Sequence, residues 1–362
     1  MILVNKKDLA EAIKVVKTSV ARQALNPILS TIKIKVKDNK LRLTSTDLCG
    51  SAQSSCEVKA DGNDKFCINA VTLDNIINKL DDEICIEKKD EHIHIKSNNT
   101  LYKVAYTSTD EFPEITFDIQ ENGFTISKDD FIDAINKSII STSNIENSIL
   151  NGVCFNFTKD NFELGATDGT RLSQIVKDFS GNTIDKKFVV PKKILGDITR
   201  CLHDEIKISI NDDNNSVIFS SNGNYFKQNL LQGTFPDYAR LIPTKFKNVV
   251  AIKRKELLTS LEKVMVMSDE KSYVTVFNFK DNLCYLNTSC EYGQAEDFIE
   301  CDYSGELKIA FNYRNIYEGL KVMDEDIIAF CINDQQSACL IKGGFTYLCM
   351  PIRIRENEVS AS

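Results

Sequence analysis

One short segment, ATDGTRLS at residues 166–173, combines side chains that could do chemistry. Asp168, Thr170 and Arg171 surround Gly169, so a carboxylate, a hydroxyl and a guanidinium lie close together. General acid–base catalysis would need a histidine or a second acid nearby, and this segment has neither. Asp-Gly is instead a strong signal for a tight turn between strands, in which the aspartate caps the turn. We therefore expect a structural role for Asp168.

Other catalytic or metal-binding patterns are absent from the sequence. The three histidines, His92, His94 and His203, lack cysteines or acids at metal-ligand spacing. The motifs of serine hydrolases, P-loop proteins and dinucleotide-binding folds are missing as well. The twelve cysteines are scattered, mostly in apolar strand-like runs, which predicts small buried side chains and no disulfides. The sequence predicts no enzyme activity, no cofactor and no metal site.

The composition indicates a globular protein with a net charge of −8. At 362 residues the chain should form two or three domains. No apolar run is long enough to span a membrane, and the first residues, MILVNKKDLAEAIK, place charges where a signal peptide needs apolar side chains. These features predict a cytoplasmic protein with no membrane partner.

Three copies of one pattern follow each other at a spacing of about 120 residues. KKDLAEAI, KDDFIDAI and RKELLTSL each predict an amphipathic helix with an acid in its first turn. A second helix recurs in FCINAVTLDNIINKL, FVVPKKILGDITRCL and IAFNYRNIYEGLKVM, with alternating strand patterns between the two helices. We predict an α+β protein of three tandem modules, each with two helices packed on antiparallel sheets, at residues 1–122, 123–245 and 246–362.

Basic residues recur on the outer faces of the equivalent helices. Lys193 and Arg200 share one face in the second module, as Arg314 and Lys321 do in the third. A charged helix face is often simply solvated, but repetition in an acidic chain favours a common surface for nucleic-acid phosphates. The residues expected to face the nucleic acid are Lys7, Lys14, Lys17, Arg22, Lys79, Lys137, Lys192, Lys193, Arg200, Lys263, Arg314 and Lys321, among which Lys137 and Lys263 correspond between modules.

Three motifs, GVCFNF…LGATDGTRLS, GTFPDYARLIP and YLCMPIRI, occur in order on this repeat, and together they closely resemble the bacterial DNA polymerase III beta subunit family, the sliding clamps. The resemblance covers essentially the whole chain. It implies a head-to-tail homodimeric ring of six similar domains, with helices around a central hole for duplex DNA. It also implies three kinds of protein partner, which are the DNA polymerase alpha subunit, the clamp loader and other proteins with a clamp-binding motif.

The resemblance further implies a partner-peptide cleft between the second and third modules. The matching residues are Leu150, Thr167, Gly169, Thr170, Arg171, Leu172, Pro236, Arg240, Leu241, Asn312, Leu348, Met350, Pro351, Ile352 and Arg353. Arg171 is expected either to bind the peptide or to brace the turn through Asp168. Thr170 and Asn315 depart from the family pattern, in which histidine and an aromatic residue are common, and residues 355–362 are expected to form a flexible tail.

Dimer contacts also follow from the resemblance. Tyr102 and Val104 of the first module should meet Val266 and Met267 in the third module of a second copy. The alternative is that all four residues are core residues within one chain. Two other functions also remain open from the sequence, a subunit of a nucleic-acid-processing enzyme and a scaffold that never meets DNA.

Overall fold

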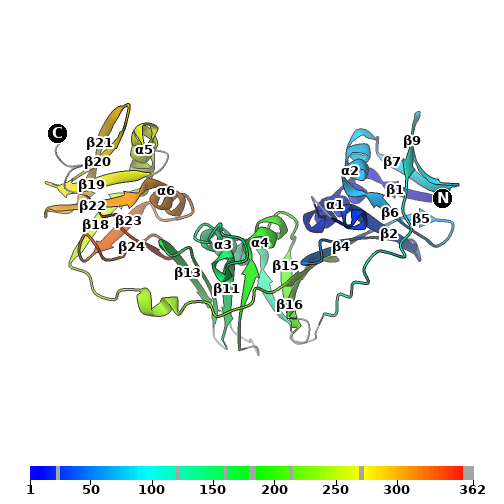
Figure 1. Ribbon diagram of the computed structural model, residues 1–362, viewed down its shortest axis with the longest axis horizontal. Coiled ribbons are helices and arrows are strands. Elements are labelled where there is room, and N and C mark those ends of the chain that lie inside the picture. The colour runs from blue at the N-terminus through cyan, green and yellow to red at the C-terminus, as the bar shows by residue number, and fades with distance from the viewer. Residues whose placement is uncertain are drawn as a thin grey trace. The chain divides into compact units, whose positions relative to one another are not determined.

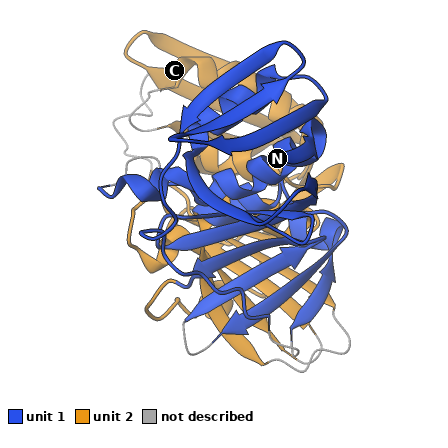
Figure 2. Ribbon diagram, turned by 90° about the vertical axis from the view of Figure 1, so that its right-hand side faces the viewer, with its two compact units in different colours: residues 1–132, 193–230 blue, residues 133–192, 231–362 orange. Residues whose placement is uncertain are grey.

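The structure is a computed structural model that describes residues 1–21, 25–119, 123–158, 161–178, 185–211, 215–268 and 273–353. The chain divides into two compact units, residues 1–132 with 193–230 and residues 133–192 with 231–362 (Figure 1, Figure 2). The division falls within helix α3 (Lys128–Ile139) and at the start of helix α4 (Lys192–Ile198). Helices and antiparallel strands occur in both units, in agreement with the predicted α+β class.

Unit 1 contains two antiparallel sheets. The smaller has the order β5 (Lys59–Ala60), β1 (Ile2–Asn5), β7 (Glu83–Lys89), β8 (His92–Ser97) and β9 (Thr100–Ala105). The larger has the order β10 (Phe124–Ser127), β15 (Glu205–Asn211), β16 (Ser216–Ser221), β17 (Asn224–Asn229), β4 (Gly50–Glu57), β3 (Lys40–Thr46), β2 (Thr31–Lys37) and β6 (Asp64–Asn69). Helices α1 (Lys6–Val16) and α2 (Ala70–Lys79) pack on these strands through buried Leu9, Ile13 and Leu73. Short 3-10 turns η1 (Lys17–Ser19) and η2 (Pro27–Ser30) complete this unit.

Unit 2 is built on one twelve-stranded sheet. Its order is β14 (Lys186–Pro191), β11 (Gly152–Phe157), β12 (Asn161–Thr167), β13 (Arg171–Asp178), β25 (Thr346–Cys349), β24 (Cys339–Lys342), β23 (Ile327–Ile332), β18 (Asn248–Lys253), β21 (Gly293–Asp302), β20 (Leu283–Cys290), β19 (Val274–Lys280) and β22 (Leu307–Asn312). Helices α5 (Arg254–Val264) and α6 (Tyr313–Lys321) bury Leu257, Leu261 and Ile316 in its core. The 3-10 turns here are η3 (Ile149–Asn151), η4 (Tyr238–Leu241) and η5 (Met265–Met267).

All six predicted helices are present, and asparagine caps three of them. Asn5 accepts from the backbone N–H of Lys7 at 2.8 Å and so starts α1. Asn69 caps α2 in the same way, and Asn312 caps α6 by accepting from Arg314 at 3.0 Å. A side-chain acceptor at this position satisfies a backbone donor that the helix itself leaves free.

Strands from neighbouring predicted modules join in one repeated register. In unit 1, β4 pairs with β17 and places Ala52 opposite Phe226. In unit 2, β13 pairs with β25 and places Ser173 opposite Tyr347. Both aromatic side chains are fully buried. The two junctions are therefore built alike, with one aromatic residue of the following module buried at each.

Candidate functional site

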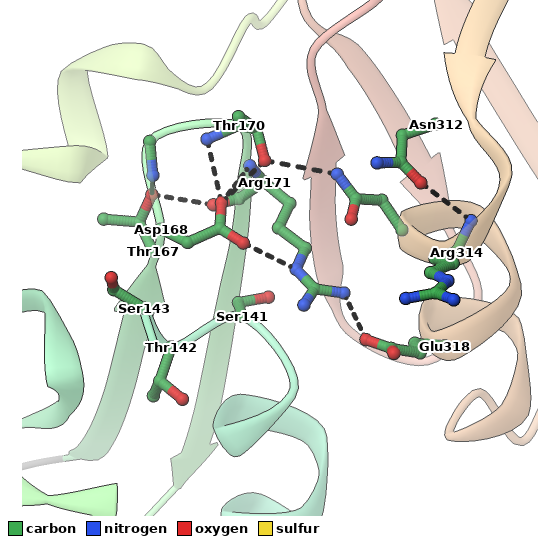
Figure 3. A network of polar contacts seen from close by, with 12 residues as sticks. Ser141, Thr142, Ser143, Thr167, Asp168, Thr170, Arg171, Asn312, Arg314 and Glu318 are labelled. Atoms are coloured by element: carbon green, nitrogen blue, oxygen red, sulfur yellow. Dashed lines mark hydrogen bonds and ion pairs between the residues drawn. The ribbon is translucent and has the colours of Figure 1, made fainter. Parts of the chain in front are cut away.

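The ATDGTRLS segment forms a tight turn between β12 and β13 (Figure 3). Gly169 has a φ of 91°, a conformation that other residues adopt only with strain. One carboxylate oxygen of Asp168 accepts from the backbone N–H groups of Thr170 at 2.8 Å and Arg171 at 3.0 Å. The hydroxyl of Thr167 donates to the carbonyl oxygen of Arg171 at 2.7 Å. Asp168 therefore holds the turn, as the sequence predicts.

Arg171 braces this turn against α6. Its Nε donates to the second carboxylate oxygen of Asp168 at 2.9 Å, and a terminal nitrogen donates to Glu318 at 2.5 Å (Figure 3). The side chain is only 12% exposed. Burial opposes the charged guanidinium, but Tyr347, Glu318 and Asp168 outweigh it and raise the pKa of Arg171 above its ordinary value. Of the two roles expected for Arg171, the geometry favours the brace.

The two positions that depart from the family pattern contact each other. Asn315 on α6 donates from Nδ2 to the hydroxyl oxygen of Thr170 at 3.2 Å. Asn315 is buried, and its backbone carbonyl accepts from the hydroxyl of Tyr347 at 2.6 Å. The backbone N–H of Met350 donates to the carbonyl oxygen of Thr170 at 2.8 Å. These bonds fix the turn to α6 and to the end of β25.

An apolar cluster begins where the turn enters β13. Leu172 and Leu348 are buried in it, and Leu150 packs against them, so three predicted cleft segments come together. Phe235 and Tyr238, which were not predicted as site residues, belong to the same cluster. Both lie in GTFPDYARLIP, where two aromatic residues in a connection without helix or strand periodicity were the available signal.

Tyr238 occupies space that Gly165 leaves open. A Cβ on Gly165 would lie 2.3 Å from a ring carbon of Tyr238, so only glycine fits in this strand position. The Tyr238 hydroxyl donates to Glu163 at 2.9 Å. Burial, together with the carboxylate of Glu163, raises the pKa of Tyr238, which keeps the hydroxyl protonated as a donor. This contact fixes the position of η4 on the sheet.

The remaining predicted cleft residues differ in exposure. Leu241 and Met350 are apolar, yet they are 62% and 42% exposed. Pro236 and Arg353 are also exposed, whereas Pro351 and Ile352 are half-buried. Arg240 pairs with Asp237 at 2.7 Å on the surface, and Asn312 is engaged as the cap of α6. The turn and the apolar cluster are thus one connected structure, with two exposed apolar side chains nearby in the chain.

Most residues predicted to face DNA are exposed on or near their helices, namely Lys7, Lys14, Lys17, Lys79, Lys193, Arg200, Lys263, Arg314 and Lys321. Several have neighbours. Lys17 pairs with Asp74, Lys193 lies 3.0 Å from Asp47, and the Arg314 guanidinium lies 3.7 Å from the ring centre of Tyr273. Lys192 is half-buried and donates to the carbonyl oxygen of Ser143 at 3.1 Å. Arg22 and the tail at 355–362 lie outside the described residues.

Lys137 is buried, so its prediction as a DNA-facing residue is wrong. Its side chain is 7% exposed, and its Nζ lies 2.6 Å from both Asp133 and Asp324. Burial disfavours the charged ammonium, but the hydrogen bonds to these two aspartates outweigh it and raise the pKa of Lys137. The helical pattern shows on which face of α3 Lys137 lies. It does not show that Asp324, from a distant part of the chain, covers this side chain.

The four predicted dimer residues lie at sheet edges and at a helix end. Tyr102 and Val104 lie on β9, half-buried against the core of unit 1. Val266 and Met267 lie in η5, directly after α5, and Val266 is 76% exposed. Val266 is therefore not a core residue of this chain. The alternative in which all four residues are core residues within one chain is thus excluded.

No group of three or more histidine, cysteine, aspartate or glutamate side chains within the described ranges could hold a metal ion. Among the same residues, no helix is both long and apolar enough to cross a membrane.

The chain matches three family models in order, covering the N-terminal, central and C-terminal domains of the DNA polymerase III beta subunit at residues 1–116, 125–237 and 239–353. It is 26% identical to the beta sliding clamp of Synechococcus elongatus, over 97% of this chain and 98% of that protein. It is 25% identical to the beta sliding clamp of Haemophilus influenzae, over 91% and 93% of the two chains.

Solved structures show the same fold. The DNA polymerase III beta subunit of Thermotoga maritima superposes with a TM-score of 0.91 at 26% identity, over 98% of this chain and 99% of that chain. The sliding clamp of Bacillus subtilis also gives a TM-score of 0.91, at 23% identity, over 98% and 99% of the two chains. The chain therefore belongs to the DNA polymerase III beta subunit family, the sliding clamps of DNA replication, which are processivity subunits and not themselves catalytic.

Proposed function

We propose that two copies of this chain close into a ring around duplex DNA, and that each copy binds partner proteins through one surface. The partners are the DNA polymerase alpha subunit, the clamp loader and other proteins with a clamp-binding motif. The place of action is the cytoplasm, where a bacterial chromosome is replicated. The repeated strand junction supports the proposed ring. The apolar cluster beside the turn supports the proposed partner binding.

Two strand edges support the proposed ring, because neither is paired, within the described part of the chain, with a strand of another module. Among the described strands, β9 pairs only with β8, and β21 is paired along its length only by β20. By the repeat, β9 corresponds to β17 and β25, and β21 corresponds to β4 and β13. An exposed strand edge is a ready template for a further strand. A second copy would supply the missing junction by pairing its β9 with β21.

The side chains support the same pairing. Tyr102 occupies on β9 the position of Phe226 and Tyr347, which are fully buried at their junctions, yet Tyr102 is only half-buried. Two further apolar side chains are left exposed on these strands, Leu101 at 49% and Phe298 at 60%. In the repeated register, Tyr102 would lie opposite Ala295 of the second copy. Covering such a patch is a normal source of dimer stability.

Dimer dissociation tests the ring proposal. Met267→Asp introduces a charge beside Val266 at the expected contact, and we expect a folded monomer in sedimentation experiments. Ile145→Asp is the matched control, because Ile145 is 71% exposed and lies in a different predicted module. A Met267→Asp protein that stays a dimer at the concentrations where the parent is a dimer would reject this interface.

The partner-binding proposal depends on a difference between the two internal junctions. At the second junction, Leu172 and Leu348 line the apolar cluster and Met350 follows β25. Their counterparts at the first junction, in the shared register, are Ser51, Lys227 and Asn229. The turn itself is the same in both, because Asp47 accepts from Gly50 as Asp168 does from Arg171.

A peptide with apolar anchors needs an apolar floor, and only the second junction provides one. Exposed Leu241 and Met350 would then be covered by the bound peptide. This predicts one peptide site per chain and two per ring. Titration calorimetry with a polymerase-derived peptide should give one site per chain, and a second equivalent site would contradict the assignment.

DNA binding in the proposed ring is topological. The exposed basic residues on α1, α4 and α6 would contact phosphates without reading bases. Several of them already lie near acids or aromatic rings, so each contact would be weak and screened by salt. A closed ring does not need tight contacts to remain on DNA, which agrees with a chain of net charge −8.

A further inference from the structure

Lys137 links two predicted modules inside unit 2. It lies on α3 and is held by Asp133 one turn earlier, at 2.6 Å. Asp324, in the connection after α6, supplies a second carboxylate at 2.6 Å. Lys177 also contacts Asp133, at 3.1 Å. The arrangement is a lysine fixed by one acid of its own module and bonded to one acid of the next.

The same position in the third module is occupied by Lys263. The alignment of Phe131 with Leu257 places Lys263 on α5 where Lys137 lies on α3. Lys263 is also held by an acid of its own module, Asp297 on β21, at 2.9 Å. Its side chain is 61% exposed, in an open groove between α5 and the β21 edge. The first half of the arrangement is therefore present, and the second acid is missing.

In the first module, the equivalent helix position also lies at the boundary with the following module. Its counterpart there is Val15, which is buried. Val15 lines a cavity together with Cys201 and His203, which come from the second module. In two of three modules this position thus lies beside residues of the following module, and in the third it is exposed.

The missing acid can be located by the same repeat. Asp324 directly follows Met323, the buried residue that ends the second helix pattern of its module. Leu80 is the equivalent buried residue of the first module, and Asp81 directly follows it. Asp81 is exposed and accepts a hydrogen bond from Asn98 at 2.8 Å. We propose that Lys263 of one copy pairs with Asp81 of the second copy, so that Asp297, Lys263 and Asp81 form a charged bridge across the ring junction.

This proposal rests on the proposed ring and adds a specific contact to it. It also moves Lys263 from the DNA-facing set to the interface. An ion pair between two copies is accessible to solvent and is therefore screened by salt. The affinity of one copy for the other should thus fall as the ionic strength rises. The corresponding bridge at Lys137 lies within one chain and cannot separate by dilution.

A double-mutant cycle on the full chain tests the pair. The dissociation constant of the dimer is measured by sedimentation for the parent, Lys263→Met, Asp81→Asn and the double variant, at low and moderate salt. Each single change should weaken the dimer by about tenfold at low salt, and the double variant should be no weaker than the single ones. Asp82→Asn is the matched control, because it removes a neighbouring acid, and its effect should simply add to that of Lys263→Met.

The outcomes separate this inference from the ring itself. If Asp81→Asn weakens the dimer equally in the parent and in the Lys263→Met background, the pair is refuted while the ring stands. If Lys263→Met and Asp81→Asn each have the dissociation constant of the parent at both salt concentrations, the pair is refuted as well. A parent chain that stays monomeric at every concentration would overturn the ring proposal and this inference with it. Thermal melting of each variant confirms that all four are folded.

Discussion

Replacing Arg171 by methionine should destabilise unit 2 without touching its core. Arg171 links the turn to α6 through Asp168 at 2.9 Å and Glu318 at 2.5 Å. Methionine keeps most of the apolar stem and removes the guanidinium, so the change isolates the charged contacts. The bond between Thr170 and Asn315 would still join the turn to α6, and the bond between Thr170 and Met350 would still join it to the end of β25.

The size of the effect follows from how exposed each partner is. Glu318 is 45% exposed and regains water when Arg171 is removed, so its bond should contribute little. Asp168 is 20% exposed and keeps its backbone donors, so it is only partly left without a partner. A hydrogen bond to a charged group contributes about 1.5–3 kcal/mol, so we expect a loss of about 2 kcal/mol in the free energy of unfolding. For a cooperative unit of this size the melting temperature should fall by about 4–8 °C.

Arg240 provides a matched control in the same unit. It forms an ion pair with Asp237 at the same sequence spacing, but the two side chains are 85% and 60% exposed. Arg240→Met should leave the melting temperature unchanged in differential scanning calorimetry, because a solvated pair contributes little to stability. Equal melting temperatures for parent, Arg171→Met and Arg240→Met would refute the role of Arg171 as a brace. An equal fall of the melting temperature in both variants would show that the burial of Arg171 does not explain its contribution to stability.

Three further predictions concern binding and pH. Met350→Ala and Leu172→Ala should each weaken a polymerase-derived peptide by about tenfold in titration calorimetry, and unchanged affinity in both would reject the surface. Reversing Lys193, Arg200, Arg314 and Lys321 to acids should speed loss from DNA and reduce the log–log salt slope by about one for each phosphate contact removed. Retention equal to the parent at every salt concentration would show that these side chains do not face DNA. Burial alone would raise the pKa of Asp133, but Lys137 and Lys177 outweigh it and hold that pKa below the usual range. Its contribution to stability is therefore present above about pH 4 and is lost as the pH falls further, so Lys137→Met should show a weaker loss of stability than the parent between about pH 4 and pH 2.

The repeat and the turn could be predicted from sequence because both are local. Helix periodicity located all six helices, three of which also have an acid in the first turn, and Asp168-Gly169 specified its turn through bonds within a few residues. The pairing of modules was not local in this sense. The register that places Tyr347 opposite Ser173 joins segments far apart in the chain, and it emerges only when the strands are seen side by side.

Lys137 and Tyr238 show why the rest of the site could not be predicted. A helical stripe states which side chains share a face, and it does not state whether another segment covers that face, as Asp324 does for Lys137. The contact of Tyr238 with Gly165 likewise depends on where a linker crosses the sheet. In both cases the missing information was tertiary contact. The same limit applied to Thr170 and Asn315, which depart from the family pattern singly in sequence and are bonded together in the fold.

Retention on circular DNA tests most directly whether the chain works as a sliding clamp. The protein is loaded onto nicked circular duplex with clamp loader and ATP, separated from free protein, and half of the sample is then cut once with a restriction enzyme. We expect the protein to stay on the circles and to leave the linearised molecules at the same salt concentration, because a topological link is lost only at a DNA end. Equal retention on circular and linear DNA, or no retention on either, would contradict this account.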